Sequence, residues 1–209
     1  NYATKKRVMR ILLIDNAKPE IAIYTPMLYN VLQCCECDVV SCKTKSDVES
    51  VVLDAFDGIV LSGSSMNLSV PLRVSSISKD AMVLLHKGDT PTLGVCFGMQ
   101  VMATVYGGDV EAMNERVERQ RTVTASSELT VLMEGLAPDF SAHFSHGDAV
   151  TRIPLGFHAT ALSPEGVDVM ENHALKKYGV QFHPEKPTGD GRAMNIIHNF
   201  LRLCAANKS

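Results

Sequence analysis

The chain has 209 residues, of which 45% are hydrophobic and 21% are charged, and its formal net charge is −3. A chain of this length and composition folds as one domain or at most two small ones, and it buries roughly 70% of the surface that its unfolded state exposes. Its apolar runs fall well short of the roughly 20 residues that a membrane helix needs, and no basic block offers long-range attraction to a polyanion. These features exclude a disordered chain and a membrane-spanning helix, and they argue against nucleic acid as a partner.

Four of the six cysteines, Cys34, Cys35, Cys37 and Cys42, fall within nine residues. Structural zinc usually takes two ligand pairs that are well separated in sequence, and no second pair follows Cys34 and Cys37. Zinc is therefore the less favoured interpretation, and we expect no metal. Unpaired thiols and an N-terminus without a signal pattern suit a reducing compartment, so we expect a cytoplasmic protein.

The first half of the chain alternates strands with helices. From the apolar periodicity and the turn residues we expect strands at 8–15, 39–42, 58–62 and 92–95, and helices at 21–32, 72–87 and 99–106. The strands at 11–14 and 58–62 are almost continuously apolar, which indicates that helices cover both faces of the sheet. This alternation predicts an α/β fold with an open, mostly parallel sheet flanked by helices.

The second half, from residue 110, contains shorter segments that are rich in β-branched residues. We expect strands at 117–125, 129–133, 143–150, 159–162, 167–171 and 178–182. These strands are expected to extend and edge the same sheet with antiparallel pairs, before a closing helix at 193–205. No repeat or linker interrupts the pattern, so we expect a single compact domain over residues 1–209.

The segment Thr92-Leu-Gly-Val-Cys-Phe-Gly-Met-Gln100 carries a candidate nucleophile. A strand runs into Cys96 and a helix leaves it, with Gly94 two residues before and Gly98 two residues after, as in the G-x-S-x-G turn of hydrolases. Such a turn strains the nucleophile and leaves no room for a Cβ at the flanking positions, while the helix N-terminus favours the reactive thiolate. The alternative interpretation is a buried structural cysteine between a strand and a helix.

A thiolate nucleophile needs a base that can also protonate the leaving group, and that base needs an orienting partner. The best-placed base is His183, because it follows the apolar strand at 178–182 and sites in open α/β sheets form at the carboxyl ends of strands. Pro184 favours extended backbone at His183, so His183 and Glu185 can share one side of the chain. A carboxylate in that place would hold the tautomer and orientation of the imidazole.

Gly94-Val-Cys-Phe-Gly-Met-Gln100 and Gly179-Val-Gln-Phe-His-Pro-Glu185 together resemble the two motifs of the class I glutamine amidotransferases. The segments 58–63 and 99–108 are similar to the oxyanion loop and to the helix after the nucleophile in that family. Ser145-His-Gly-Asp148 and residues 110–116 are similar to segments of its GMP synthetase branch. The resemblance implies a flavodoxin-like sheet, and the motifs are nearest to the glutaminase domain or subunit of GMP synthetase.

Carried over to this sequence, the resemblance makes Cys96 the nucleophile, His183 the general acid and base, and Glu185 its orienting partner. The backbone N–H groups of Gly63 and Phe97 would form the oxyanion hole. It further implies that the substrate is glutamine, that no cofactor is used, and that the released ammonia passes to an ATP-dependent synthetase on a separate chain. The residues implied to bind glutamine are Gln100, Ser145 and His146.

Three segments depart from the family pattern and leave other functions open. The usual Gly-Pro step after the first loop glycine is replaced by Ser64-Ser65, and residues 117–121 and 186–190 also differ. The first alternative is a free-standing hydrolase of γ-glutamyl amides or peptides that uses the same triad and needs no ammonia acceptor. The second is a catalytically quiet regulatory relative, which the Ser64-Ser65 substitution motivates.

Overall fold

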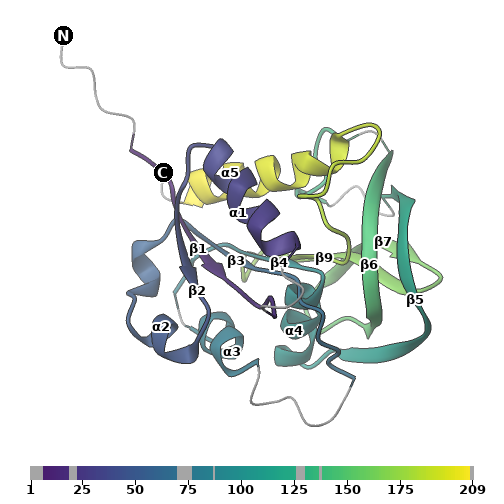
Figure 1. Ribbon diagram of the computed structural model, residues 1–209, viewed down its shortest axis with the longest axis horizontal. Helices are drawn as coiled ribbons and strands as arrows, with labels where there is room; N and C mark the ends of the chain where they lie inside the picture. Colours follow the sequence, from purple (N-terminus) through teal and green to yellow (C-terminus); the bar gives the residue numbers. More distant parts are fainter. Residues whose placement is uncertain are drawn as a thin grey trace.

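The centre of the computed structural model is a seven-stranded sheet in the order β2-β1-β3-β4-β9-β8-β7 (Figure 1). The structure describes residues 7–18, 23–69, 77–86, 88–125, 130–136 and 138–207. The strands of this sheet are β1 (Arg10–Ile14), β2 (Asp38–Cys42), β3 (Gly58–Leu61), β4 (Thr92–Val95), β7 (His158–Ser163), β8 (Gly166–Asn172) and β9 (Lys177–Val180). The five strands from β2 to β9 pair in parallel, while β8 and β7 add antiparallel pairs at one edge. The expected open and mostly parallel sheet is confirmed.

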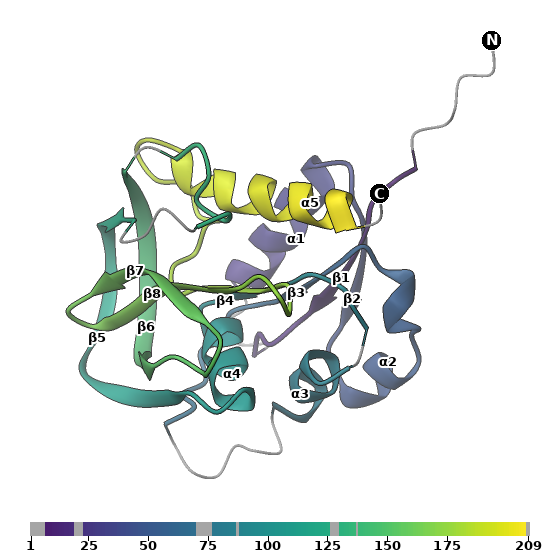
Figure 2. The same ribbon diagram turned by 180° about the vertical axis from the view of Figure 1, so that it is seen from behind.

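Helices cover both faces of the sheet (Figures 1 and 2). They are α1 (Tyr24–Cys34), α2 (Lys45–Glu49), α3 (Ser78–Leu84), α4 (Phe97–Val105) and α5 (Asn195–Asn207), with 3-10 turns η2 (Leu53–Ala55) and η4 (Arg192–Met194). Helices α1 and α5 lie on one face, and α2, α3 and α4 lie on the other. Within β1, Ile11 and Leu13 join one apolar cluster and Leu12 and Ile14 join the other. Burial of both faces explains why this strand is apolar at every position after Arg10.

The two longest strands stand apart from the main sheet and correct one expectation. β5 (Asp109–Thr124) and β6 (Asp139–Arg152) pair only with each other in the described sheets, and a register shift lies between Ala112 and Val117. Most β5 side chains are exposed, so this strand lacks the second apolar face that a place inside the main sheet would require. Of the strands expected after residue 110, β7, β8 and β9 join the main sheet, as predicted.

The expected strand at 129–133 is wrong over the part that the structure describes. Residues 130–136 form turns, and residue 129 lies outside the described ranges. The buried carboxylate of Glu171 accepts hydrogen bonds from the Val131 and Leu132 N–H groups, and the Asn199 amide donates to the Leu132 and Glu134 carbonyl oxygens. Because buried side chains satisfy these backbone groups, the segment needs no strand partner.

Helix boundaries differ from the expectations by a few residues. α3 begins at Ser78 within the expected 72–87, of which 72–76 and 87 lie outside the described residues. α4 begins at Phe97, directly after the strained turn. α2 was not expected, although Thr44 and Asp47 form a capping box, which is a signal for the N-terminus of a helix. Within the described ranges, no helix combines the length and the apolar character needed to cross a membrane.

Candidate active site

The pairing of β4 with β9 brings the two candidate motifs together. These strands are parallel neighbours, with Gly94 opposite Gly179 and Val95 opposite Val180. Their carboxyl ends therefore meet at the same edge of the sheet, and Cys96 directly follows one of them while His183 lies three residues beyond the other. The Cys96 N–H donates to the Val180 carbonyl oxygen at 2.7 Å, which ties the turn to β9.

The turn at Cys96 has the strained geometry that the glycine spacing predicts. Cys96 is the N-cap of α4, with φ 52° and ψ −107°, a conformation that side-chain-bearing residues rarely adopt. A Cβ on Gly94 would lie 2.6 Å from the backbone of Gly98, and a Cβ on Gly98 would lie 2.3 Å from the Leu61 carbonyl oxygen. The glycines therefore allow α4 to pack directly against β3 and β4, which fixes the place of the sulfur.

His183 is held by a carboxylate on its own loop, as the spacing predicts. Its Nδ1 hydrogen-bonds the Glu185 Oε1 at 2.8 Å, and both side chains are at most 2% exposed. The His183 N–H also donates to the His143 carbonyl oxygen at 2.8 Å. Its Nε2 is buried and has no hydrogen-bond partner among the described residues, so this nitrogen is available to a reacting group.

The electrostatics of the site favour a charged imidazole. Burial opposes the charged form, but the Glu185 carboxylate and the neighbouring Cys96 sulfur outweigh it and raise the pKa of His183 well above its usual value near 6.5. Cys96 is 2% exposed, and its sulfur lies 3.6 Å from both the Ser145 carbonyl oxygen and the Gln181 amide nitrogen. A thiol, an imidazole and a carboxylate, the groups that a cysteine nucleophile requires, thus lie together in a buried site.

The backbone of Gly63 lies close to His183 and Cys96. A Cβ built on it would lie 3.0 Å from the His183 Cε1 and 3.6 Å from the Cys96 Cβ, so its backbone borders both reacting groups. Phe97 is the first residue of α4, and the N–H of a first helical residue has no acceptor within its helix. The Phe97 N–H, next to the sulfur-bearing residue, is therefore not used within α4.

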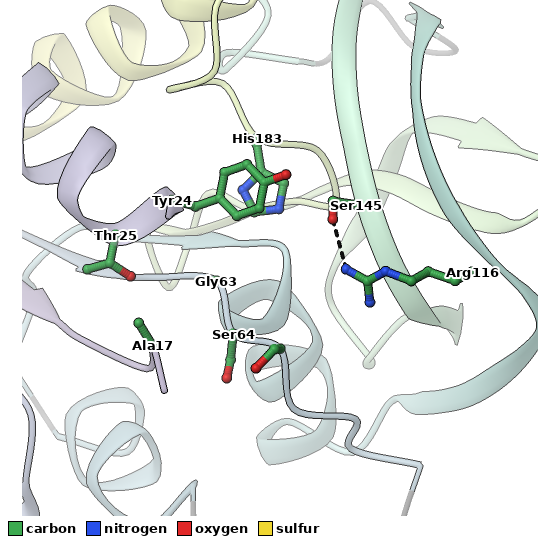
Figure 3. A pocket seen from close by; sticks show the side chains of 9 residues that line it. Ala17, Tyr24, Thr25, Gly63, Ser64, Arg116, Ser145 and His183 are labelled. Carbon is green, nitrogen blue, oxygen red and sulfur yellow. Dashed lines mark hydrogen bonds between the residues drawn. The ribbon is translucent and has the colours of Figure 1, made fainter. Parts of the chain in front are cut away.

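A small pocket opens beside His183, the one residue of the candidate triad that lines it (Figure 3). Its lining residues are Ala17, Tyr24, Thr25, Gly63, Ser64, Ser65, Arg116, Ser145 and His183. The Ser64 hydroxyl accepts a hydrogen bond from the Met66 N–H at 3.2 Å, while the Ser65 hydroxyl is buried and has no partner among the described residues. The two serines that replace the usual Gly-Pro step thus shape one wall of the pocket.

The structure separates the three residues that the resemblance implied for glutamine binding. Ser145 lines the pocket, whereas Gln100 and His146 do not. The Gln100 Nε2 donates to the Asp148 carbonyl oxygen at 2.8 Å and to the Gln181 Oε1 at 3.1 Å, and Gln181 in turn donates to the Cys96 sulfur. The His146 Nδ1 contacts the same Asp148 carbonyl oxygen at 2.9 Å. Gln100 and His146 therefore touch protein groups behind the nucleophile.

Comparison with known proteins identifies the family. A family model described as glutamine amidotransferase class-I matches residues 12–203. The chain belongs to the class I glutamine amidotransferases.

Among curated relatives of this amidotransferase chain, one subunit of the glutamine-hydrolyzing GMP synthase of Sulfolobus acidocaldarius is 36% identical over 154 residues, which cover 73% of this chain and 79% of that protein. The glutamine-hydrolyzing GMP synthase of Haemophilus ducreyi is 34% identical over 160 residues, and this match covers 73% of the present chain but 29% of that enzyme. A solved Thermoplasma acidophilum protein assigned as a GMP synthase subunit has a TM-score of 0.84 at 24% identity, with 98% of each chain covered. The last comparison supports the fold.

Sequence reasoning missed a cluster of side chains beside the candidate triad of this amidotransferase chain. The Tyr24 ring stacks on the His183 ring with centroids 3.8 Å apart (Figure 3). Its hydroxyl contacts the His143 Nε2 at 3.1 Å. The same Nε2 lies 3.0 Å from the Glu118 carboxylate and 2.9 Å from the Lys186 ammonium. Burial and Lys186 lower the pKa of His143, although Glu118 opposes them. No sequence signal marks Tyr24, which the periodicity assigns to the apolar face of α1.

Arg116 is the second residue whose place the sequence did not indicate. The charged run of β5 is typical of a solvated face, yet the Arg116 guanidinium lines the pocket and donates to the Ser145 hydroxyl at 2.9 Å. It also borders a larger groove along β5 and β6 that Glu111, Met113, Arg119 and Glu165 help to line. Arg116 therefore stands between the pocket and that groove.

Proposed function

We propose that the chain hydrolyses the side-chain amide of glutamine to glutamate and ammonia. The ammonia then passes to an ATP-dependent synthetase on a separate chain, so that this chain acts as the glutaminase subunit of a GMP synthase. The observation that carries this proposal is the buried Cys96–His183–Glu185 arrangement beside the Gly63 backbone. The relatives that are named as one subunit of a GMP synthase support the placement of glutamine hydrolysis and synthetase activity on two separate chains.

The proposed reaction proceeds in two steps. The Cys96 thiolate attacks the amide carbon, the Gly63 and Phe97 N–H groups stabilise the oxyanion, and the His183 imidazolium protonates the departing nitrogen to release ammonia. His183 then takes a proton from water as the water oxygen attacks the γ-glutamyl thioester, and the Cys96 thiolate leaves. The new carboxylic acid loses its proton to solvent, which gives glutamate and restores the starting thiolate and imidazolium. Glu185 orients the imidazole and stabilises its charged form throughout.

We propose that the α-carboxylate of glutamine faces Arg116 and Ser145 in the pocket. Arg116 places a guanidinium at the pocket wall, and a guanidinium is the side chain best suited to bind a carboxylate in two-point geometry. Gln100 and His146 would act indirectly in this arrangement, through the Asp148 carbonyl oxygen and Gln181.

We also propose that residues 1–209 form one glutaminase domain of a cytoplasmic enzyme. The family match over 12–203 supports the first part, and the six unpaired cysteines, of which Cys34 is exposed, suit a reducing compartment.

The decisive experiment measures glutamate and ammonia from the purified chain with and without the synthetase component of a GMP synthase, with Cys96→Ala as the control. Glutamine hydrolysis that requires Cys96 and supports GMP formation with the synthetase would support the proposal. Rapid cleavage of γ-glutamyl peptides by the chain alone would instead support the free-standing hydrolase. If a glutamine-like electrophile formed no adduct with Cys96 under either condition, the chain would instead be a catalytically quiet relative.

A further inference from the structure

A buried polar cluster that the triad does not use lies directly behind the oxyanion loop. It consists of Asn16, Ser62, Lys79 and Asp80, and we call it the Asn16 cluster. Asp80 and Ser62 are fully buried, and Asn16 and Lys79 are 4% and 7% exposed. A buried ion pair such as Lys79–Asp80 adds little net stability, because desolvation offsets the attraction between the charges. The stability of the fold therefore does not by itself explain why these polar side chains are buried together.

The Asn16 side chain is fully hydrogen-bonded within the cluster. Its Nδ2 donates to the Asp80 Oδ1 at 2.8 Å and to the Ser62 carbonyl oxygen at 3.3 Å, and its Oδ1 accepts from the Lys79 ammonium. The Lys79 ammonium also donates to the Asp80 Oδ2 at 3.2 Å. The ion pair thus fixes the orientation of the amide, and the amide fixes the Ser62 carbonyl group.

The Ser62 hydroxyl holds the next peptide. It accepts hydrogen bonds from the Asn16 N–H at 2.9 Å and from the Thr25 hydroxyl at 3.1 Å, and it donates its one proton to the Gly63 carbonyl oxygen at 3.2 Å. Both peptide units that flank Gly63 are therefore held through their carbonyl oxygens by buried groups.

This arrangement sets the direction of the Gly63 N–H. A trans peptide places its N–H opposite its C=O, so the Gly63 N–H points away from the Asn16 amide that holds the Ser62 carbonyl. Glycine has the widest backbone freedom of any residue, and the Ser64-Ser65 sequence lacks the proline that stiffens this loop in the family pattern. The orientation of the oxyanion donor must then come from side chains that hold the loop backbone in place.

We infer that the Asn16 cluster is a positioning device that keeps the Gly63 N–H directed at the oxyanion in the isolated chain. This inference rests on the proposed glutaminase function, and it adds that the oxyanion hole is assembled before any partner binds. Asn16, Ser62, Lys79 and Asp80 are positioning residues in this view, because they act on the reaction through the Gly63 backbone.

The test compares Asn16→Ala with Asn199→Ala. Asn199 is the matched control, since it is 3% exposed and its amide also donates to two carbonyl oxygens, at 2.8 and 2.9 Å, in a turn that lies outside the pocket. Each variant is measured for glutamine hydrolysis by the isolated chain, for Cys96 alkylation by iodoacetamide, which forms no oxyanion, and for urea unfolding.

We expect the isolated wild type to hydrolyse glutamine and Asn16→Ala to lower kcat by about 10²-fold, the loss that follows removal of one oxyanion donor. KM and the alkylation rate should change by less than about threefold in this variant. Asn199→Ala should lose stability in urea but keep its kcat. Ser62→Ala, a smaller change that leaves the Asn16 amide in place, should lower kcat by about tenfold and covers the case in which Asn16→Ala does not fold.

Three results would overturn the inference. They are an unchanged kcat in Asn16→Ala or Ser62→Ala, an equal loss of kcat in Asn199→Ala, and a wild-type chain that hydrolyses glutamine only after a synthetase is added. The last result would leave the proposed function standing. A wild type whose Cys96 reacts normally with iodoacetamide but which hydrolyses no glutamine with or without the synthetase would overturn both.

Discussion

Gly98→Ala should damage the reaction through a displacement that the structure defines. The new Cβ would lie 2.3 Å from the Leu61 carbonyl oxygen and 2.7 Å from the Leu61 Cβ, where ordinary contacts begin near 3.4 Å. α4 must therefore move by about 1 Å from β3, because neither backbone can yield locally. Overpacking of this kind costs roughly 1–3 kcal/mol of stability.

The catalytic loss should exceed the loss of stability. Cys96 caps α4 and Gly63 follows β3, so separation of the two elements moves the sulfur from the oxyanion donor. A misplacement of about 1 Å can lower the rate by about 10²-fold. We expect kcat/KM for glutamine to fall by about that factor in a chain that still unfolds cooperatively in urea.

Gly189→Ala is the control for this substitution. No atom lies within 4 Å of the Cβ position of Gly189, and its φ is outside the left-handed region. The control should therefore keep the activity and the stability of the wild type. If Gly98→Ala matched it in both assays, the close packing of α4 on β3 would not be what positions the nucleophile.

Four further predictions concern the triad and a buried lysine. Cys96→Ala should abolish glutamine hydrolysis and leave the urea midpoint nearly unchanged, and any remaining turnover would refute the nucleophile assignment. Glu185→Gln should slow the reaction less than His183→Ala, because the carboxylate orients and the imidazole moves the proton, and equal losses in kcat would mean that these roles are misassigned. Since the folded-state pKa of His183 is raised, its charged form stabilises the fold at low pH, and this contribution is lost as the pH rises through that pKa. The loss of unfolding free energy caused by His183→Gln should thus be larger at pH 6 than at pH 10. A loss that grew with pH would contradict an ion pair between the His183 imidazolium and the Glu185 carboxylate. Burial lowers the pKa of Lys177 to about 8, so the charged side chain destabilises the fold at pH 7 and Lys177→Met should raise the Tm there. The gain in Tm should shrink between pH 8 and 10.5, where the folded and then the unfolded chain lose the lysine proton. A gain in Tm that did not depend on pH would show that packing, and not charge, is responsible.

The chemistry-bearing turn was predictable because local rules determine it. Gly94 is required by its contact with the Gly98 backbone four residues away, and the strand, the turn and the helix follow from the same short segment, although Gly98 itself is required by the distant Leu61. His183 and Glu185 were predictable for a similar reason, since extended backbone at two-residue spacing puts both side chains on one side. The parallel sheet followed from the alternation of strands and helices.

The features that the sequence did not reveal depend on partners distant in the chain. Tyr24 has the spacing of a core residue, and its contact with His183 exists because α1 packs against the loop after β9. Arg116 belongs to an exposed charged run, and its place at the pocket depends on the β5–β6 pairing. The segment 130–136 is apolar enough for a strand, but the buried Glu171 side chain takes its backbone donors.

The neighbouring positions of β4 and β9 have a consequence for biosynthesis. Between these strands the chain builds α4 and the four strands β5 to β8 before it returns to pair with β4. Contacts between residues so distant in sequence form late and slowly during folding. While the ribosome is still adding the intervening segments, the emerging polypeptide carries a thiol with no proton acceptor, and it can release no ammonia until the returning strand has docked.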